Sequence, residues 1–189
     1  MTRAFDPRSL PAGLLDELLD LARRAPSAGN AQGWHALVLE GAATADFWDV
    51  TLAQERRASF AWPSLLLAPV IVLPFADPDA YVRRYAEADK AATGLGAGRE
   101  AWPTPYWTVD AAMAVHGLLL AAEAAGLGAL FFAVFNGADE LRDVLGVPPR
   151  MELLGAVALG YRAEASERAG RSAGRPRRPL DEVVHRGRW

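Results

Sequence analysis

The stretch PSAGNAQGW, residues 26–34, stands between a helical pattern and the strand pattern HALVLE of residues 35–40. A helix-to-strand connection usually needs about four residues, yet this one is longer and consists of small residues and amides before a large Trp34. Small residues let the backbone approach a flat ligand closely, and Ser, Asn and Gln side chains can hydrogen-bond the edge of a heteroaromatic ring. On composition alone, a long turn whose amides satisfy their own backbone is the more common explanation.

Outward from this stretch, strand patterns alternate with helical patterns. Apolar runs rich in β-branched and aromatic residues predict strands at 35–41, 68–76, 129–135 and 152–161. Helical periodicity and capping residues predict helices from residue 11 to about 22, and at 45–58, 77–92, 108–125 and 138–145. Strands separated by helices predict a layered domain whose sheet is covered.

Composition excludes several classes of protein. The 189 residues carry a net charge of -3, which argues against nucleic acid as the main partner. Cysteine is absent, so disulfides, thiolate nucleophiles and Cys-based metal sites are excluded, and the chain fits a reducing compartment. Neither a signal sequence nor a membrane-spanning run is evident, so we expect a cytoplasmic protein without a membrane partner.

The side chains form no recognisable metal site, nucleotide-binding motif or catalytic motif. His35, His116 and His185 are far apart and lack carboxylates at ligand spacing, so we predict no metal site. The run GLGAGR at 94–99 lacks dinucleotide-fingerprint spacing and a preceding strand, and neither a phosphate loop nor a G-x-S-x-G elbow is present. We therefore predict no catalytic side chain; where the protein offers no such chemistry, a cofactor often supplies it.

The opening stretch resembles the P-S-x-x-N-x-Q-P-W motif of the FMN-dependent nitroreductase family. Gly33 replaces the usual proline, and the matching residues are Pro26, Ser27, Asn30, Gln32 and Trp34. Three further segments agree with the family in the same order: residues 2–6, residues 105–135, and residues 152–162 followed by 175–189. The resemblance spans essentially the whole chain.

The resemblance implies an α+β fold with a central mixed β-sheet flanked by helices, assembled as an intertwined homodimer. Residues 1–162 would form the FMN-binding domain, and residues 163–189 a basic C-terminal arm that crosses to the partner subunit. Two FMN molecules would lie at the interface. The implied activity is that of an FMN-dependent oxidoreductase, which passes hydride from NAD(P)H through flavin N5 to a small, aromatic or quinone-like acceptor in a ping-pong cycle.

The resemblance also implies site residues. Pro26, Ser27, Ala28 and Asn30 should line the flavin edge, the backbone of residues 133–134 should approach N5, and arginines should meet the ribityl and phosphate groups. The full cofactor-binding set is Arg3, Pro26, Ser27, Ala28, Asn30, Gln32, Ala133, Val134, Arg175, Arg177 and Arg178.

The loop at 93–107 is too long and too aromatic to serve only as a connection. We predict that Trp102, Tyr106 and Trp107 wall the acceptor site and stack on flat substrates. The alternative is that some of these rings pack into the core or the dimer interface. This alternative applies most strongly to Trp107, which lies beside the predicted helix 108–125.

Two departures from the family pattern bear on the site. An Arg and a Ser usually precede the position of Thr2, but here Met1 holds the Ser position; either other arginines bind the phosphate, or the chain starts upstream of Met1. Residues 60–69, FAWPSLLLAP, are aromatic and apolar where many members place an amide and a lysine. Alternative functions are a specialised member that desaturates, dehalogenates or cleaves flavin, or a protein that stores FMN without turnover.

Overall fold

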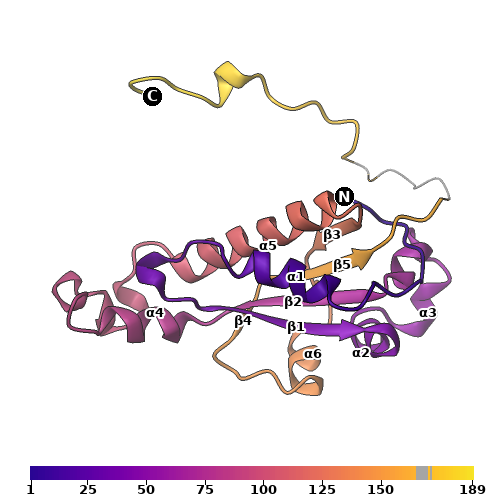
Figure 1. The fold of residues 1–189 in the computed structure, drawn as a ribbon, viewed down its shortest axis with the longest axis horizontal. Coiled ribbons are helices and arrows are strands. Elements are labelled where there is room, and N and C mark those ends of the chain that lie inside the picture. The colour runs from indigo at the N-terminus through magenta and orange to yellow at the C-terminus, as the bar shows by residue number, and fades with distance from the viewer. Residues whose placement is uncertain (165–169, 171) are drawn as a thin grey trace.

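One antiparallel sheet forms the centre of the computed structural model, which describes residues 1–164, 170 and 172–189. Its strands are β1 (Trp34–Glu40), β2 (Val70–Ala76), β3 (Gly128–Phe132), β4 (Glu152–Leu153) and β5 (Ala156–Gly160). The strand order is β1-β2-β5-β3, and the short β4 also pairs with β2 (Figure 1). Every pairing between these strands is antiparallel, so the α+β fold is confirmed with an antiparallel sheet in place of the expected mixed one.

Strand β2 is the centre of the core because all seven of its residues are buried. Its side chains alternate between the two faces of the sheet, as strand geometry requires. Val70 and Val72 pack into one apolar cluster, whereas Ile71 and Leu73 pack into another on the opposite face. A strand covered on both faces reads as a continuous apolar run, which explains the sequence VIVLPFA.

Helices cover both faces of the sheet. The helices α1 (Leu14–Ala22) and α5 (Tyr106–Ala124) share the cluster that contains Val70 and Val72. The helices α2 (Thr44–Thr51) and α6 (Ala138–Val144) join the cluster on the other face. The remaining helices, α3 (Gln54–Arg57) and α4 (Pro78–Tyr85), lie at opposite ends of the molecule (Figure 1).

Several elements differ from their predicted extents, including the first helix, which begins at Leu14, and the strand predicted at 129–135, which ends at Phe132. The predicted helix 45–58 is broken between α2 and α3, because Leu52 adopts extended backbone and packs against the core. The predicted strand 152–161 is split at Gly155, whose backbone has φ 145° and approaches Phe132 so closely that a Cβ would lie 2.6 Å from the Phe132 carbonyl oxygen. Helix α4 ends at Tyr85, seven residues before its predicted end, and short turns follow it.

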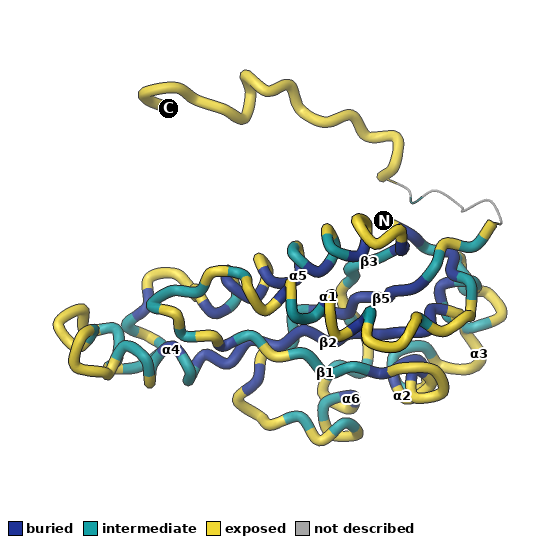
Figure 2. The backbone as a smooth tube through the Cα atoms, in the orientation of Figure 1, coloured by how far each residue is buried: buried dark blue, intermediate teal, exposed yellow. Residues whose placement is uncertain are grey.

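The C-terminal segment lies outside the layered domain. Strand β5 ends at Gly160, and an isolated bridge between Phe5 and Arg162 attaches the chain to the N-terminal segment. All residues from 172 to 189 are exposed and extend away from the sheet (Figure 2). Residues 165–169 and 171 of the predicted arm lie outside the described residues. Within the described part of the chain, no helix is both long enough and apolar enough to cross a membrane.

Candidate functional site

The loop after α1 adopts an unusual backbone conformation. A short turn at Ala28–Asn30 is followed by two residues that lead into Gly33. Gly29, Asn30 and Gln32 all have positive φ, at 60°, 56° and 52°. Glycine and asparagine tolerate the left-handed region, whereas glutamine rarely enters it. The small and amide residues of this stretch therefore serve a tight backbone path that ordinary side chains disfavour.

Side chains from α4 and α5 hold this loop in place. One carboxylate oxygen of Asp110, Oδ2, accepts hydrogen bonds from the Ala28 N–H at 2.7 Å and from the Tyr81 hydroxyl at 2.8 Å. Asp110 is only 5% exposed. Burial and then this hydrogen bond raise the pKa of Tyr81, so its hydroxyl stays protonated and keeps donating.

A second anchor comes from Arg84 on α4. Its Nε donates to the Gly29 carbonyl oxygen at 2.8 Å, while its other nitrogens pair with Asp89 at 2.8 Å. The guanidinium of Arg84 lowers the pKa of Asp89 to about 2, so this pair stays charged near neutral pH. Within the loop, Ser27 Oγ accepts a hydrogen bond from the Gln32 N–H at 3.0 Å. The loop is thus fixed by groups far away in the sequence.

Gly33, which replaces the proline of the motif, is required by packing. A Cβ at this position would lie 2.6 Å from the Tyr81 ring and 2.9 Å from the Asp77 carbonyl oxygen. Real Cβ atoms essentially never approach that closely. Because proline also carries a Cβ, the Tyr81 ring accounts for the departure from the motif at this position.

A small cavity of about 160 Å³ opens beneath the loop. Three of the predicted cofactor-binding residues line it, namely Pro26, Ser27 and Gln32, and Ala28 and Asn30 do not. Trp34 also lines it, and the buried indole N–H of Trp34 has no hydrogen-bond partner among the described residues. A buried donor without an acceptor is unfavourable, so this N–H favours a ligand with acceptor atoms.

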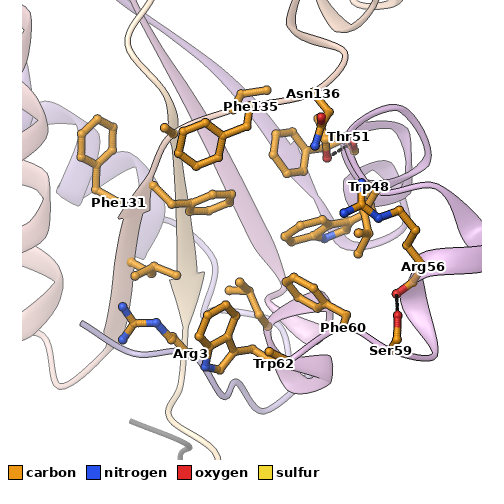
Figure 3. A pocket seen from close by; sticks show the side chains of 18 residues that line it. Arg3, Trp48, Thr51, Arg56, Ser59, Phe60, Trp62, Phe131, Phe135 and Asn136 are labelled. Carbon is orange, nitrogen blue, oxygen red and sulfur yellow. Dashed lines mark hydrogen bonds between the residues drawn. The ribbon is translucent and has the colours of Figure 1, made fainter. Parts of the chain in front are cut away.

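A second, larger cavity of about 440 Å³ lies between α2, α3 and the end of β3 (Figure 3). Three more predicted residues line it, namely Arg3, Ala133 and Val134. Its walls are dominated by aromatic rings: Phe47, Trp48, Phe60, Trp62, Phe131, Phe132 and Phe135. The volume falls within the usual range for a small-molecule site.

The electrostatics of this aromatic cavity favour an electron-rich or anionic ligand. Arg3 and Arg56 line it from two sides, and none of its described lining residues is acidic (Figure 3). The Arg3 guanidinium lies 5.5 Å from the centre of the Trp62 ring, which is cation–π range. The indole N–H of Trp48 is buried and, like that of Trp34, has no hydrogen-bond partner among the described residues.

FMN fits these two cavities chemically. Its ring system is flat and partly apolar, and its edge presents the acceptor atoms that the orphaned indole N–H groups require. The left-handed loop and the aromatic cavity could each receive part of such a ring. Among the described residues, no group of three His, Asp or Glu side chains could hold a metal ion.

The predicted acceptor-site aromatics lie elsewhere. Trp102 and Trp107 are buried in a cluster with Tyr81, and neither lines the two cavities. Their indole groups are satisfied within the protein, because Trp102 donates to the Leu95 carbonyl oxygen and Trp107 to Glu152. The packing alternative therefore describes these two rings in this chain, whereas Tyr106 remains exposed at the start of α5.

The arginines of the arm contact neither cavity in a single chain. Arg175, Arg177 and Arg178 are all exposed in the segment that extends away from the domain. The two halves of the predicted flavin site are also separated, because the two cavities share no described lining residue. Helices α4 and α5 contribute to the loop cavity, whereas α2 and α3 contribute to the aromatic cavity, and α4 and α3 lie at opposite ends of the molecule (Figure 1).

Several residues of the site went unnoticed in the sequence. Asp110, Tyr81 and Arg84 hold the loop, and Trp48 and Arg56 line the aromatic cavity. Only Asp110 carried a signal, because a single carboxylate within the otherwise apolar first turns of a long helix demands a partner. The other four look like ordinary surface or core residues until the fold brings them to the cavities.

Comparisons with known proteins agree with this geometry. The sequence matches the Nitroreductase family over residues 1–161. A protein of Thermus thermophilus named NADH dehydrogenase is 32% identical over an alignment of 198 positions, which covers 96% of this chain and 89% of that protein. A 4-nitrobenzoate reductase of a Nocardioides species is 26% identical over 211 residues, covering 96% of this chain and 84% of the relative.

The fold is shared with solved structures. A protein of Exiguobacterium sibiricum, described as a nitroreductase and solved in complex with FMN, superposes with a TM-score of 0.74. It is 16% identical, and the superposition covers 97% of this chain and 91% of that one. Sequence and fold together show that the chain belongs to the nitroreductase family, the FMN-dependent NAD(P)H oxidoreductases.

Proposed function

We propose that this chain acts as a homodimer in which the loop cavity of one subunit and the aromatic cavity of the other together hold each FMN. The observation that carries this proposal is the separation of the predicted contacts. Pro26 and Ser27 lie in one cavity, and Ala133 and Val134 in another with no shared lining residue. Contacts that lie in two separate cavities of one chain can meet on one ring when each cavity comes from a different copy of the chain.

The exposed face of α5 supplies the surface for such a dimer. Residues at a spacing of three and four along the helix are exposed, and all but one of them are apolar. They are Tyr106, Val109, Met113, His116 and Leu120. A contiguous apolar stripe of this length on a monomer is typical of a permanent interface. We expect the dimer to bury more than about 2,000 Å² in total.

In this dimer different residues bind different parts of the cofactor. Pro26, Ser27 and Gln32, which line the loop cavity, lie along one edge of the ring, and the backbone at Ala133 and Val134 faces its reactive region. FMN, once bound, takes hydride from NAD(P)H and passes it to the acceptor. The protein binds the flavin, shields one of its faces and excludes water.

The arm completes the site from the partner subunit. It bears Arg175, Arg177 and Arg178, none of which is buried within its own chain. Arginine can meet a phosphate through two hydrogen bonds at once. We therefore assign the flavin phosphate to these arginines, and the ribityl and phosphate side of the aromatic cavity to Arg3.

The acceptor is a small aromatic or quinone-like molecule. The aromatic lining of the larger cavity and the reduction of 4-nitrobenzoate named for the Nocardioides relative both support this class. Of the three aromatics predicted at the acceptor site, Tyr106 is exposed on the interface stripe, and we assign it to the acceptor site. Trp102 and Trp107 would act only indirectly, by supporting the loop through Tyr81.

The proposal is tested on purified protein. We expect a yellow dimer of about 40 kDa, twice the 20.3 kDa of one chain, in analytical ultracentrifugation at micromolar concentration. We also expect oxidation of NADH or NADPH with a nitroaromatic or quinone acceptor. A colourless 20 kDa species would contradict the proposal, and a yellow dimer without turnover would indicate flavin storage instead.

A further inference from the structure

The aromatic cavity has an end that the flavin contacts do not explain. Ala133 and Val134, assigned to the flavin, lie at the end of β3, whereas α2 and α3 contribute Trp48 and Arg56 to the opposite wall (Figure 3). Both residues lie outside the segments on which the resemblance to the family rests.

The rings at this end form a flat, ordered wall. Trp48 and Phe132 are almost parallel, with 5° between their planes and 6.1 Å between ring centres. Phe47 stands edge-on to both of them, at 79° to Trp48 and 83° to Phe132. Such a wall favours a flat aromatic occupant, which can stack on one face and meet ring edges with its own.

Two adjacent arginines lie at this end, and they differ in their partners. Arg57, the next residue, pairs with Asp49 at 2.6 Å and also donates to the Leu52 carbonyl oxygen. Arg56 makes no ion pair with another described residue, although its guanidinium turns toward Trp48 (Figure 3). Since none of the described lining residues is acidic, the charge of Arg56 is left for a ligand.

We propose that Arg56 selects acceptors that carry an anionic group, such as a carboxylate, on the ring opposite the reducible group. The ring lies against Trp48 and Phe132, and the carboxylate pairs with the guanidinium of Arg56. The reducible group then points toward Ala133 and Val134, where the flavin lies. This inference rests on the proposed function for the position of the flavin, and it adds the substrate class.

The test compares two ligands that differ only in charge. 4-Nitrobenzoate and its neutral isostere 4-nitrobenzamide are titrated into the oxidised flavin-containing protein, by calorimetry and by the change in flavin absorbance. The wild-type protein should bind the carboxylate more tightly. Arg56→Gln should weaken carboxylate binding about tenfold, as expected for one partly exposed charge-assisted pair, and leave amide binding unchanged.

Arg57→Gln is the matched control, because it removes the same charge from the neighbouring residue, whose side chain does not line the cavity. It should leave both affinities unchanged, and Arg56→Lys should retain part of the preference for the carboxylate. Equal losses for both ligands in Arg56→Gln, or the same loss in Arg57→Gln, would overturn the inference. So would a wild-type preference for the amide.

Failure of this inference and failure of the proposed function can be told apart. A yellow protein that oxidises NAD(P)H but shows no charge preference retains the proposed function and refutes the role of Arg56. A colourless protein whose calorimetry still shows the Arg56-dependent preference retains the anion site and refutes the proposed function.

Discussion

Asp110 offers the sharpest test of how the flavin-binding loop is held. Substituting Asp110→Ala removes the oxygen that accepts both the Ala28 N–H and the Tyr81 hydroxyl. Two donors are then left without their acceptor. We expect the loop to loosen at its first turn, with a loss of stability and of flavin affinity together.

The magnitude follows from the burial of the two donors. A stranded buried donor costs about 1–3 kcal/mol, and more when its acceptor was charged. Tyr81 and Asp110 line the small cavity, so water that enters it can replace part of the lost hydrogen bonding of the Tyr81 hydroxyl, whereas Ala28 does not line that cavity. We expect the free energy of unfolding to fall by about 2–4 kcal/mol in total, which lowers the Tm by roughly 4–16 °C in a chain of this size.

Thermal and urea unfolding at fixed protein concentration measure this change, because stability of a dimer depends on concentration. Asp143→Ala is the matched control, since Asp143 is an exposed helical aspartate. It should change stability by less than about 0.5 kcal/mol. In a double-mutant cycle, Tyr81→Phe should cost about 1–2 kcal/mol in the wild type and close to nothing beside Asp110→Ala.

Two outcomes would refute this reasoning. One is that Asp110→Ala is no more destabilising than Asp143→Ala. The other is that the effects of Asp110→Ala and Tyr81→Phe are additive, because independent effects would mean that the two groups do not share a hydrogen bond.

Four further predictions concern the same loop, helix α5 and the arm. Burial and Asp110 raise the pKa of Tyr81 above its unfolded value near 10, so the contribution of Tyr81 to stability is fully present below about pH 10. Above pH 10 the free energy of unfolding should fall by up to about 1.4 kcal/mol per pH unit. Urea unfolding curves recorded at several pH values should lose this pH dependence in Tyr81→Phe. Gly33→Ala should cost about 1–3 kcal/mol because its Cβ would meet the Tyr81 ring at 2.6 Å. Gly117→Ala, whose Cβ would lie 3.8 Å from its nearest neighbour, should stabilise helix α5 by about 0.5–1 kcal/mol in the same thermal unfolding assay, and equal effects of the two substitutions would contradict the packing argument. Arg177→Ala should weaken FMN binding roughly ten- to a hundredfold, with a smaller loss for riboflavin, in flavin titrations of the apoprotein; equal losses would mean that Arg177 does not bind the phosphate.

The sequence predicted the elements whose signal is local. The run VIVLPFA predicted a buried strand, and the long apolar segment that ends at Gly126 predicted a core helix; β2 and α5 confirm both predictions. Breaks within elements were harder to predict. Leu52 and Gly155 interrupt a helix and a strand because of contacts with the core and with Phe132, which lie far away in the sequence.

The predicted site residues came from the resemblance, and their roles stay predictions. Pro26, Ser27 and Gln32 line one cavity and Ala133 and Val134 another, whereas Trp102 lies in a buried cluster with Tyr81. Aromatic residues in a Gly- and Pro-rich loop look the same in sequence whether they face a ligand or the core. Arg57 pairs with Asp49 and Arg56 does not, and no pattern in a single sequence predicts which of the two adjacent arginines forms this ion pair.

The separation of the two cavities has a genetic consequence. In the proposed dimer each flavin site takes its loop from one chain and its aromatic wall from the other. A variant disabled in the loop and a variant disabled in the flavin-binding part of the aromatic wall would therefore complement one another when co-expressed. The mixed dimer holds one site with both defects and one site with none, so random pairing of the two variants restores about a quarter of the sites to their wild-type state.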